Sequence, residues 1–275
     1  MESLTPAERY AAAKAKSQAK QLHPISNNFF ETFDFELDEF QIKGCHAIEA
    51  GKGVLVAAPT GAGKTIVGEF AAYLALMQEK KCFYTTPIKA LSNQKYQEFV
   101  ERFGETKVGL LTGDNSINTD AQIVVMTTEV LRNMLYTGSS TLTNLGYVVM
   151  DEVHYLADKF RGAVWEEILI HLPERIQIVS LSATVSNAEE FGEWLKTVRG
   201  ETEVVLSEIR PVPLYQHILI GNRLLDLFVD DGRVNPELVR LERNSTRRIP
   251  GGDFSGREKG WNARSFSVKI GRAHV

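Results

Sequence analysis

A segment of eight residues, Ala58-Pro59-Thr60-Gly61-Ala62-Gly63-Lys64-Thr65, has the composition of a loop that binds phosphate groups. It follows the apolar run 54–57 and precedes the helix-patterned stretch 66–77, which is the strand–loop–helix context that such a loop needs. Glycines let backbone N–H groups turn toward phosphate oxygens, and the helix N-terminus adds positive charge. We therefore predict a nucleoside triphosphate site formed by Thr60, Gly61, Ala62, Gly63, Lys64 and Thr65.

Two of these side chains have specific chemical roles. Lys64 brings a mobile positive charge to the β and γ phosphates, and the Thr65 hydroxyl can ligate Mg²⁺. Ala58 stands where the strict motif has glycine, and an ordinary turn before a core helix is the alternative interpretation. The agreement of strand, loop, Lys-Thr pair and helix favours the phosphate site.

A second group of chemically active residues, Asp151-Glu152-Val153-His154, follows the apolar run 147–150. An acid at the end of an apolar strand can hold the Mg²⁺ of a nucleoside triphosphate, so we predict Asp151 as a metal ligand opposite Thr65. Glu152 would orient and deprotonate the attacking water, which is the task of a general base. Two acids that cap the next helix are the alternative, and the phosphate loop upstream weighs against it.

Small hydroxyl residues follow another apolar run, 176–179, in the segment Ser180-Leu181-Ser182-Ala183-Thr184. Their hydroxyls could bond to Asp151 or His154 and so sense the γ phosphate. A turn or helix cap is the better interpretation of this segment in isolation. In this order and spacing, we predict His154, Ser182 and Thr184 as coupling residues.

Short apolar runs alternate with helix-patterned stretches between residues 35 and 210. The predicted strands cover 54–58, 83–86, 108–111, 123–127, 147–150, 176–181 and 204–206, and the predicted helices lie near 64–78, 88–103, 129–136, 163–171 and 187–197. Continuous apolar strands separated by helices predict an α/β fold, with a parallel sheet covered by helices on both faces. Ligands of such folds bind at the carboxyl ends of the strands.

The chain divides into three predicted regions. Residues 1–34 form an N-terminal helical extension, with a capping box at Thr5-Pro6-Ala7-Glu8 and a helix that runs to Lys20. Residues 35–210 form the α/β domain. Residues 211–275 are predicted to be a linker or the truncated start of a following region, because the chain from Asp230 onward is polar and lacks a helix or strand period.

The end of the chain, Lys269-Ile270-Gly271-Arg272-Ala273-His274-Val275, resembles the translation of a common sequencing adapter. We therefore expect the tail, from Asn262 or earlier, to be an artefact of a truncated reading frame. A natural flexible tail is the alternative.

The composition excludes some classes of protein. A net charge of −4 gives no general attraction to nucleic acid, so any such surface must be local. No apolar run approaches the ~20 residues of a membrane-spanning helix, and the N-terminus lacks the pattern of a secretory signal. Two cysteines, Cys45 and Cys82, cannot form a disulfide framework, so we expect a cytoplasmic protein.

Together, the segments 58–65, 151–154 and 182–184 resemble motifs I, II and III of the superfamily-two DExH-box helicases. The segments 35–41 and 85–94 resemble the adenine-reading segment and motif Ia of the superkiller-type, exosome-associated branch. Residues 151–158 and 161–167 are most similar to its bacterial members, the HelY-type proteins of actinobacteria. The resemblance covers residues 35–220, and it implies a RecA-like domain in an ATP-dependent helicase.

This resemblance implies an adenine site upstream of the phosphate loop. Gln41 would bond the adenine edge, and Phe35 or Phe40 would pack against the base. Glu39 departs from the family pattern, which often has proline at this position, but it leaves Gln41 in place. Packing of Phe35, Leu37 and Phe40 in the core is the plainer interpretation of those three residues.

The resemblance also implies that strand-end loops hold the phosphodiester backbone of one nucleic-acid strand. Backbone N–H groups, hydroxyls and helix N-termini can bind phosphates without reading bases, and such binding is sensitive to salt. Each loop alone could be a simple turn. The predicted contacts are Pro87, Lys89, Asn93, Gly113, Thr127, Thr128 and Glu129.

A helicase of this type closes a second RecA-like domain, which supplies arginine fingers, around ATP. No second strand–helix pattern follows Arg210, so we expect these 275 residues to bind Mg²⁺–ATP, to hydrolyse it slowly and not to unwind duplexes. RNA is the favoured substrate. A DNA repair helicase and a nucleotide-gated binding module without turnover remain the alternatives.

Overall fold

The computed structural model describes residue 5 and residues 21–157, 162–183, 188–220, 223–229 and 232–246. The chain separates into two compact units, and the boundary between them in the sequence lies between Pro211 and Val212. Most of the predicted N-terminal helix, the coupling residue Thr184 and the suspected artefactual tail lie outside the described residues. Among the described helices, none combines the length and the apolar character that crossing a bilayer requires.

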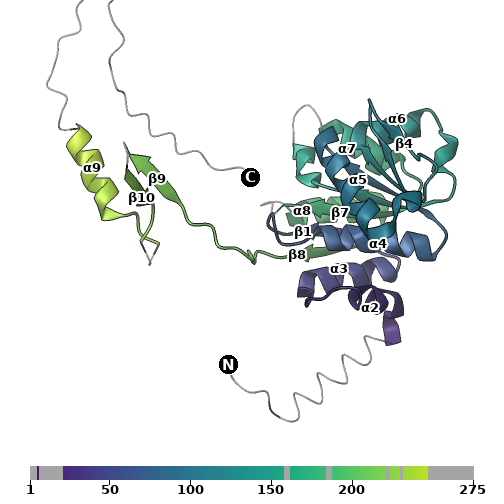
Figure 1. Cartoon of the computed structure of the whole chain (residues 1–275), viewed down its shortest axis with the longest axis horizontal. Coiled ribbons are helices and arrows are strands. Elements are labelled where there is room, and N and C mark those ends of the chain that lie inside the picture. Colours follow the sequence, from purple (N-terminus) through teal and green to yellow (C-terminus); the bar gives the residue numbers. More distant parts are fainter. Residues whose placement is uncertain are drawn as a thin grey trace, which may run out of the picture. The chain divides into compact units, whose positions relative to one another are not determined.

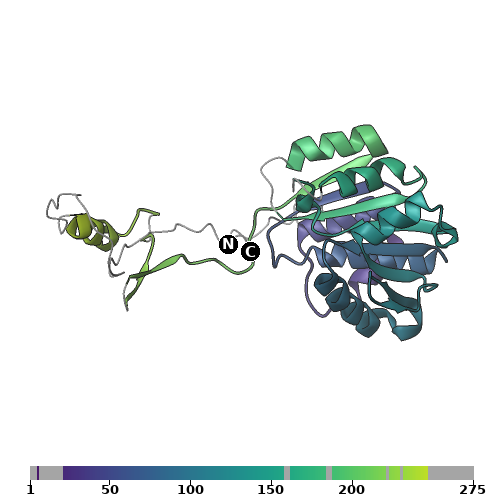
Figure 2. The same cartoon turned by 90° about the horizontal axis from the view of Figure 1, so that it is seen from above.

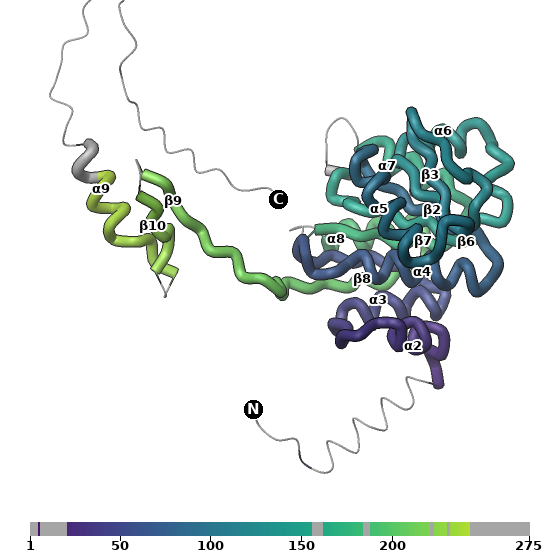
Figure 3. The backbone as a smooth tube through the Cα atoms, in the orientation of Figure 1, coloured from purple at the N-terminus to yellow at the C-terminus, as the bar shows by residue number. Residues whose placement is uncertain are grey.

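The first unit is built on one eight-stranded sheet of order β4-β3-β5-β2-β6-β7-β1-β8 (Figures 1 and 3). All of its strand pairs are parallel except the edge pair β3–β4. The strands are β1 Gly53–Ala57, β2 Lys81–Thr86, β3 Val108–Leu111, β4 Ser116–Ile117, β5 Ile123–Thr127, β6 Leu145–Met150, β7 Gln177–Ser182 and β8 Thr202–Leu206. Apart from β4, each of these strands overlaps one predicted from an apolar run.

Helices cover both faces of this sheet (Figure 2). The helices are α2 Pro24–Phe30, α3 Glu39–Glu49, α4 Thr65–Met77, α5 Lys89–Phe103, α6 Thr128–Tyr136, α7 Gly162–His171 and α8 Ala188–Arg199, with short 3-10 turns at Glu105–Lys107, Ser140–Leu142 and Val153–Ala157. Strand β1 shows how the two faces alternate. Val54 and Val56 pack in the cluster under α2 to α5, and Leu55 packs in the cluster under α6 to α8.

The register of the sheet aligns the carboxyl ends of its central strands. Ala57 of β1 pairs with Ser182 of β7, and Ser180 of β7 pairs with Met150 of β6. On the other side of β6, Met150 pairs with Thr85 of β2, and Thr86 pairs with Thr127 of β5. The loops that follow six neighbouring strands, from β3 to β1, therefore lie side by side at the carboxyl ends of these strands, which we call the carboxyl edge of the sheet.

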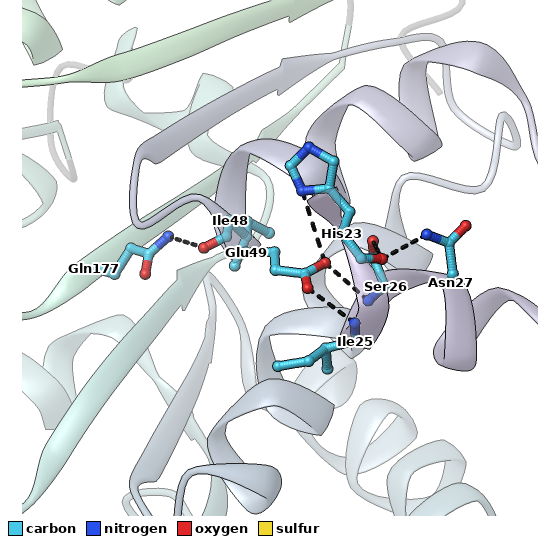
Figure 4. A network of polar contacts seen from close by, with 7 residues as sticks. All are labelled: His23, Ile25, Ser26, Asn27, Ile48, Glu49 and Gln177. Atoms are coloured by element: carbon cyan, nitrogen blue, oxygen red, sulfur yellow. Dashed lines mark hydrogen bonds and ion pairs between the residues drawn. The ribbon is translucent and has the colours of Figure 1, made fainter. Parts of the chain in front are cut away.

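A polar network joins α2 to the rest of the domain (Figure 4). The carboxylate of Glu49, at the end of α3, accepts hydrogen bonds from the backbone N–H groups of Ile25 and Ser26, both at 2.9 Å. These are two of the N–H groups that a helix N-terminus leaves without an intrahelical partner. Gln177 of β7 donates to the carbonyl oxygen of Ile48 at 2.8 Å, so the same end of α3 is also fixed to the sheet.

The second unit has regular structure, and the prediction that the chain lacks a helix beyond Asp230 is wrong for residues 236–246, whereas residues 247–275 lie outside the described part of the chain. Residues Pro236–Thr246 form helix α9, and the antiparallel strands β9 His217–Ile220 and β10 Arg223–Asp226 form a hairpin before it. The helix is amphipathic but strongly polar, and Asn235 stabilises its start by accepting the N–H of Glu237 at 3.0 Å. A polar composition was therefore a poor guide to the absence of a helix.

Candidate nucleotide and nucleic-acid site

The predicted phosphate loop runs from the end of β1 to the start of α4, as its motif requires. Gly61 and Gly63 have φ angles of 83° and 81°, which lie in the left-handed region that favours glycine. Lys64 turns back across the loop, and its Nζ donates to the carbonyl oxygens of Ala58 and Pro59 at 3.0 and 3.1 Å. A phosphate group would compete with these two carbonyls for the ammonium group.

Gln41 connects α3 directly to the phosphate loop. Its Nε2 donates to the carbonyl oxygen of Gly63 at 3.0 Å, and its Oε1 accepts the N–H of Asp38 at 2.8 Å as part of a capping box. The side chain is buried, so both ends of the carboxamide are used inside the protein. A bond from Gln41 to an adenine edge would therefore require one of these contacts to be exchanged.

Of the two aromatic side chains predicted near the adenine, only Phe35 is accessible. Phe35 is 59% exposed, whereas Phe40 is 6% exposed and packs in the core. The structure thus assigns the two interpretations of this segment to different residues. Phe40 has the structural role, and Phe35 is free to contact a ligand.

Asp151 lies at the carboxyl end of β6, where it contacts the neighbouring strand β2. The hydroxyl of Tyr84 donates to its Oδ2 at 2.7 Å, and the N–H of Asp151 donates to the carbonyl oxygen of Thr85 at 2.9 Å. Burial raises the pKa of Asp151, and the hydrogen bond from Tyr84 opposes that shift. Sequence reasoning missed Tyr84, although a tyrosine within an apolar strand signals a buried hydroxyl that needs a partner.

Glu152 has a backbone conformation that is unusual for its residue type. Its φ angle is 56°, in the left-handed region, and such strain is often found where a side chain must be presented in one direction. Its Oε2 lies 3.2 Å from Nδ1 of His154, but the geometry is not that of a hydrogen bond, and both buried atoms lack a hydrogen-bond partner in the described part of the chain. The contact with His154 lowers the pKa of Glu152, and Lys64 contributes in the same direction.

Electrostatics link the phosphate loop to the acidic segment. Burial lowers the pKa of Lys64, and the nearby carboxylates of Glu152 and Asp151 oppose that shift. Ser182 is buried at the end of β7, and its carbonyl oxygen accepts the N–H of Ala58 at 3.1 Å. Three segments that lie far apart in the sequence therefore meet at the carboxyl ends of β1, β6 and β7.

The predicted nucleic-acid contacts lie along the adjacent part of the same edge, after β2, β5 and β3. Their accessibility differs: Lys89, Asn93 and Gly113 are exposed, Glu129 is half-buried, and Pro87, Thr127 and Thr128 are buried. The Thr128 hydroxyl donates to the carbonyl oxygen of Thr86 at 3.1 Å, so it supports the backbone between two loops. Lys89 forms an ion pair with Asp114.

The residues at this edge fit a nucleoside triphosphate with Mg²⁺. At Gly61 an added Cβ would meet nothing within 4 Å, so the loop is open on this side, and at Gly63 it would meet Nε2 of Gln41 at 2.6 Å. An ammonium group, a threonine hydroxyl and two carboxylates converge on one edge, which are the groups that phosphate and a hard divalent cation prefer. The buried Oε2 of Glu152 forms no hydrogen bond with the described residues, and it lies 3.2 Å from Nδ1 of His154.

Comparison with known proteins shows the family to which these features belong. The model of the DEAD/DEAH box helicase family matches residues 38–191, which is more than half of the chain. The chain belongs to the DEAD/DEAH box helicase family. The predicted resemblance to DExH-box helicases is therefore confirmed.

Two relatives of this DEAD/DEAH box chain show its branch. The chain is 62% identical over 217 residues to a probable helicase HelY of Mycobacterium leprae, a match that covers 77% of this chain and 24% of the relative. It is 41% identical over 268 residues to the human exosome RNA helicase MTR4, a match that covers 94% of this chain and 25% of the relative. The predicted HelY-type, exosome-associated branch is confirmed, and the chain spans about a quarter of the length of these relatives.

A solved structure supports the fold of this DEAD/DEAH box domain. A hypothetical ATP-dependent RNA helicase from Sulfolobus tokodaii matches with a TM-score of 0.53 and 24% identity, over 66% of this chain and 56% of that one. At this level of identity the match shows the fold alone. The predicted RecA-like sheet with helices on both faces is confirmed.

Proposed function

We propose that this chain is the first nucleotide-binding domain of an ATP-dependent helicase that acts on RNA. The observation that carries the proposal is the convergence of Lys64, Asp151 and Glu152 at one sheet edge, next to loops suited to phosphodiester groups. One edge can then bind a nucleotide at β1, β7 and β6 and a nucleic-acid strand at β2, β5 and β3.

The residues of the nucleotide half divide the catalytic work. The Gly61–Gly63 backbone would hold the phosphates, and Lys64 would exchange its two carbonyl partners for β and γ oxygens. Thr65 and Asp151 would hold Mg²⁺, which supplies neutralisation of the charge that develops during phosphoryl transfer. Glu152, whose Oε2 lies 3.2 Å from Nδ1 of His154, would turn a carboxylate oxygen toward the attacking water and accept its proton.

RNA is favoured as the nucleic acid because the human relative is an exosome RNA helicase. Two features of this chain suit the backbone of either nucleic acid. The loops after β2, β5 and β3 can hold a backbone without reading bases. Lys89 supplies an exposed charge at the start of α5, where the helix N-terminus also attracts phosphate. We also propose a reducing, cytoplasmic location, because Cys45 and Cys82 are both free and buried.

The experiment compares Lys64→Ala and Glu152→Gln with the wild-type chain, measuring equilibrium binding of Mg²⁺–ATP and the rate of hydrolysis with and without single-stranded RNA. We expect Lys64→Ala to lose nucleotide binding. We expect Glu152→Gln to bind ATP but to hydrolyse it about 10²–10⁴-fold more slowly, because it cannot accept the proton. Hydrolysis that survives Glu152→Gln contradicts the proposed mechanism.

Two further outcomes separate the alternatives. A wild-type chain that binds ATP and RNA, but shows no hydrolysis in the presence of its nucleic acid, favours the nucleotide-gated binding module. Equal or tighter binding to single-stranded DNA of the same sequence favours a DNA repair helicase, because a true RNA site gains contacts to the 2′-hydroxyl. We expect slow turnover and no unwinding from the 275 residues alone, which span about a quarter of the length of their relatives. By the family resemblance, arginine fingers come from a second RecA-like domain, and they contribute about 10³–10⁵ to the rate.

A further inference from the structure

The segment between α2 and α3 carries the accessible aromatic residue of the site, yet it has no helix or strand of its own. Phe35 is exposed, and its ring meets that of Phe33 edge to face, with centroids 5.3 Å apart. An exposed ring on an irregular segment needs a rigid neighbour to hold one orientation, because each free torsion must be ordered when a ligand binds. Phe33 is that neighbour.

Phe33 is itself held in place by packing against the domain core. Its ring lies edge to face with Phe29, with centroids 5.1 Å apart, and Phe29 is fully buried against Phe70 and Tyr73. Helix α2, which carries Phe29, is anchored to α3 by the Glu49 carboxylate (Figure 4). The aromatic contacts thus run from the core to the exposed ring of Phe35.

One basic residue from a different helix contacts both of the inner rings. The guanidinium carbon of Arg102, in the last turn of α5, lies 4.5 Å from the centroid of Phe33 and 5.6 Å from that of Phe29. Its Nη2 donates to the hydroxyl of Thr32, and its Nε lies 3.9 Å from Oε2 of Glu69 on α4. A planar guanidinium can stack on a ring and donate in its own plane at the same time, which an ammonium group cannot do.

We propose that Arg102 is a positioning residue for base recognition, which holds Phe33 and through it Phe35 in the orientation that packs against the purine base of a nucleoside triphosphate. This inference rests on the proposed function, because it needs the triphosphate to lie on the loop that Gln41 contacts. Phe35 precedes Asp38, the N-terminal capping residue of α3, by three positions. The aromatic segment therefore leads directly into α3, whose Gln41 contacts the phosphate loop. In the described part of the chain, Arg102 contacts Phe29, Phe33, Thr32 and Glu69, none of which is a predicted phosphate or metal contact.

The test measures how well the chain distinguishes a nucleotide from its phosphates. Equilibrium affinities are determined for two probes, a non-hydrolysable ATP analogue and inorganic triphosphate, both with Mg²⁺. For Arg102→Met we expect the ratio of the two affinities to fall about three- to tenfold, with the affinity for triphosphate unchanged. Arg102→Lys should show a similar loss, because it keeps the charge facing Glu69 but loses the planar contact.

Two other variants make the result specific. Arg132→Met removes an arginine of similar accessibility that pairs with Glu167 rather than with a ring, and its affinity ratio should equal that of the wild type. Phe35→Leu should lower the ratio as Arg102→Lys does, and the double variant should lower it no further, because both changes act through the same ring. Additive losses would overturn the proposal.

The failure of this inference and that of the proposed function give different results. If Lys64→Ala binds both probes as the wild type does, the proposed function is wrong. If Lys64→Ala loses both probes while Arg102→Met and Arg102→Lys keep the wild-type ratio, the nucleotide site stands and the positioning role is overturned. Should Arg102→Met fail to fold, Arg102→Lys decides the question.

Discussion

The hydroxyl of Tyr84 donates to Oδ2 of Asp151 at 2.7 Å, and this hydrogen bond joins the two halves of the sheet edge. Tyr84 lies on β2, which leads into the predicted nucleic-acid loops, and Asp151 follows β6, in the predicted nucleotide site. The ring of Tyr84 also packs edge to face against Phe99 of α5, and Nζ of Lys95 lies 5.7 Å from its centroid. The predicted metal ligand is therefore bonded to β2 and, through the ring of Tyr84, linked to α5, and these two elements contain the segment 85–94 that resembles motif Ia.

Tyr84→Phe tests the strength of this link, because it removes the hydroxyl and keeps the ring contacts. We expect the free energy of unfolding to fall by about 1–3 kcal/mol, since the buried carboxylate loses a hydrogen-bond donor. Tyr147→Phe is the matched control, because the Tyr147 hydroxyl donates to the neutral side chain of Gln78 at 2.8 Å. Urea unfolding of both variants should show the smaller loss for Tyr147→Phe, and equal losses would contradict the role of the charged acceptor.

Two glycines of the phosphate loop offer a comparison in which only the surroundings differ. Gly61→Ala and Gly63→Ala both place a Cβ on a residue with φ near 80°, which costs about 1 kcal/mol or more. Only at Gly63 would the new atom approach Nε2 of Gln41, at 2.6 Å. We therefore expect Gly63→Ala to be the more destabilising in urea unfolding and to displace Gln41.

Nucleotide affinity extends this comparison. If the contact between Gln41 and the loop shapes the phosphate site, Gly63→Ala should also bind Mg²⁺–ATP more weakly than Gly61→Ala does. A Gly61→Ala variant that is the less stable of the two would show that the close approach of Gln41 is unimportant.

The stability of the domain should decrease in mild acid because of a stacked histidine pair. His46 stacks on His23, with ring centroids 4.1 Å apart and planes within 9°. Burial, together with His23, lowers the pKa of His46 below its usual 6.5, and Glu49 opposes that shift. Because the folded state favours the neutral imidazole, this stabilisation is complete above pH 6.5 and is lost as the pH falls through the lowered pKa.

His46→Gln is the variant that tests this pH dependence. The free energy of unfolding, measured by urea titration from pH 7.5 down to about pH 5, should fall less steeply for His46→Gln than for the wild type. Identical slopes for His46→Gln and the wild type would show that the pKa of His46 does not change on folding.

Much of the fold could be predicted because its signals are local. Strands such as Val108–Leu111 and Ile123–Thr127 are apolar runs, since a strand in a covered parallel sheet is buried on both faces. Strand β4, Ser116–Ile117, escaped because it is two exposed residues long, and its antiparallel pairing at the edge leaves no pattern. Helix α9 was not predicted, because its apolar stripe is narrow within a polar segment.

The candidate site was predictable only in part, because some of its contacts depend on distant pairing. The phosphate loop and the pair Asp151-Glu152 are motifs of adjacent residues, whereas the bond from Tyr84 to Asp151 spans 67 positions. Arg102 carries no motif, since its role depends on α5 ending beside α2. The internal bonds of Gln41 likewise follow from tertiary packing.

The exposed pair of Lys89 and Asp114 gives a prediction for the nucleic-acid half in which two variants act in opposite directions. Lys89→Gln should weaken binding to single-stranded RNA and reduce the slope of log K against log salt by about 0.7, the contribution of one phosphate contact on a single strand. Asp114→Asn should tighten binding at low salt, because the carboxylate that now pairs with Lys89 competes with phosphate.

Lys107→Gln is the charge-matched control for that experiment. Lys107 is exposed at the amino end of β3, so it lies on the side of the sheet away from the loops that follow the strands. It should leave both the affinity and the salt slope close to those of the wild type. Fluorescence anisotropy with a labelled oligonucleotide at several salt concentrations measures all four chains. Equal effects of Lys89→Gln and Lys107→Gln would mean that RNA is attracted by overall charge and that the loops after β2, β5 and β3 do not form its binding surface.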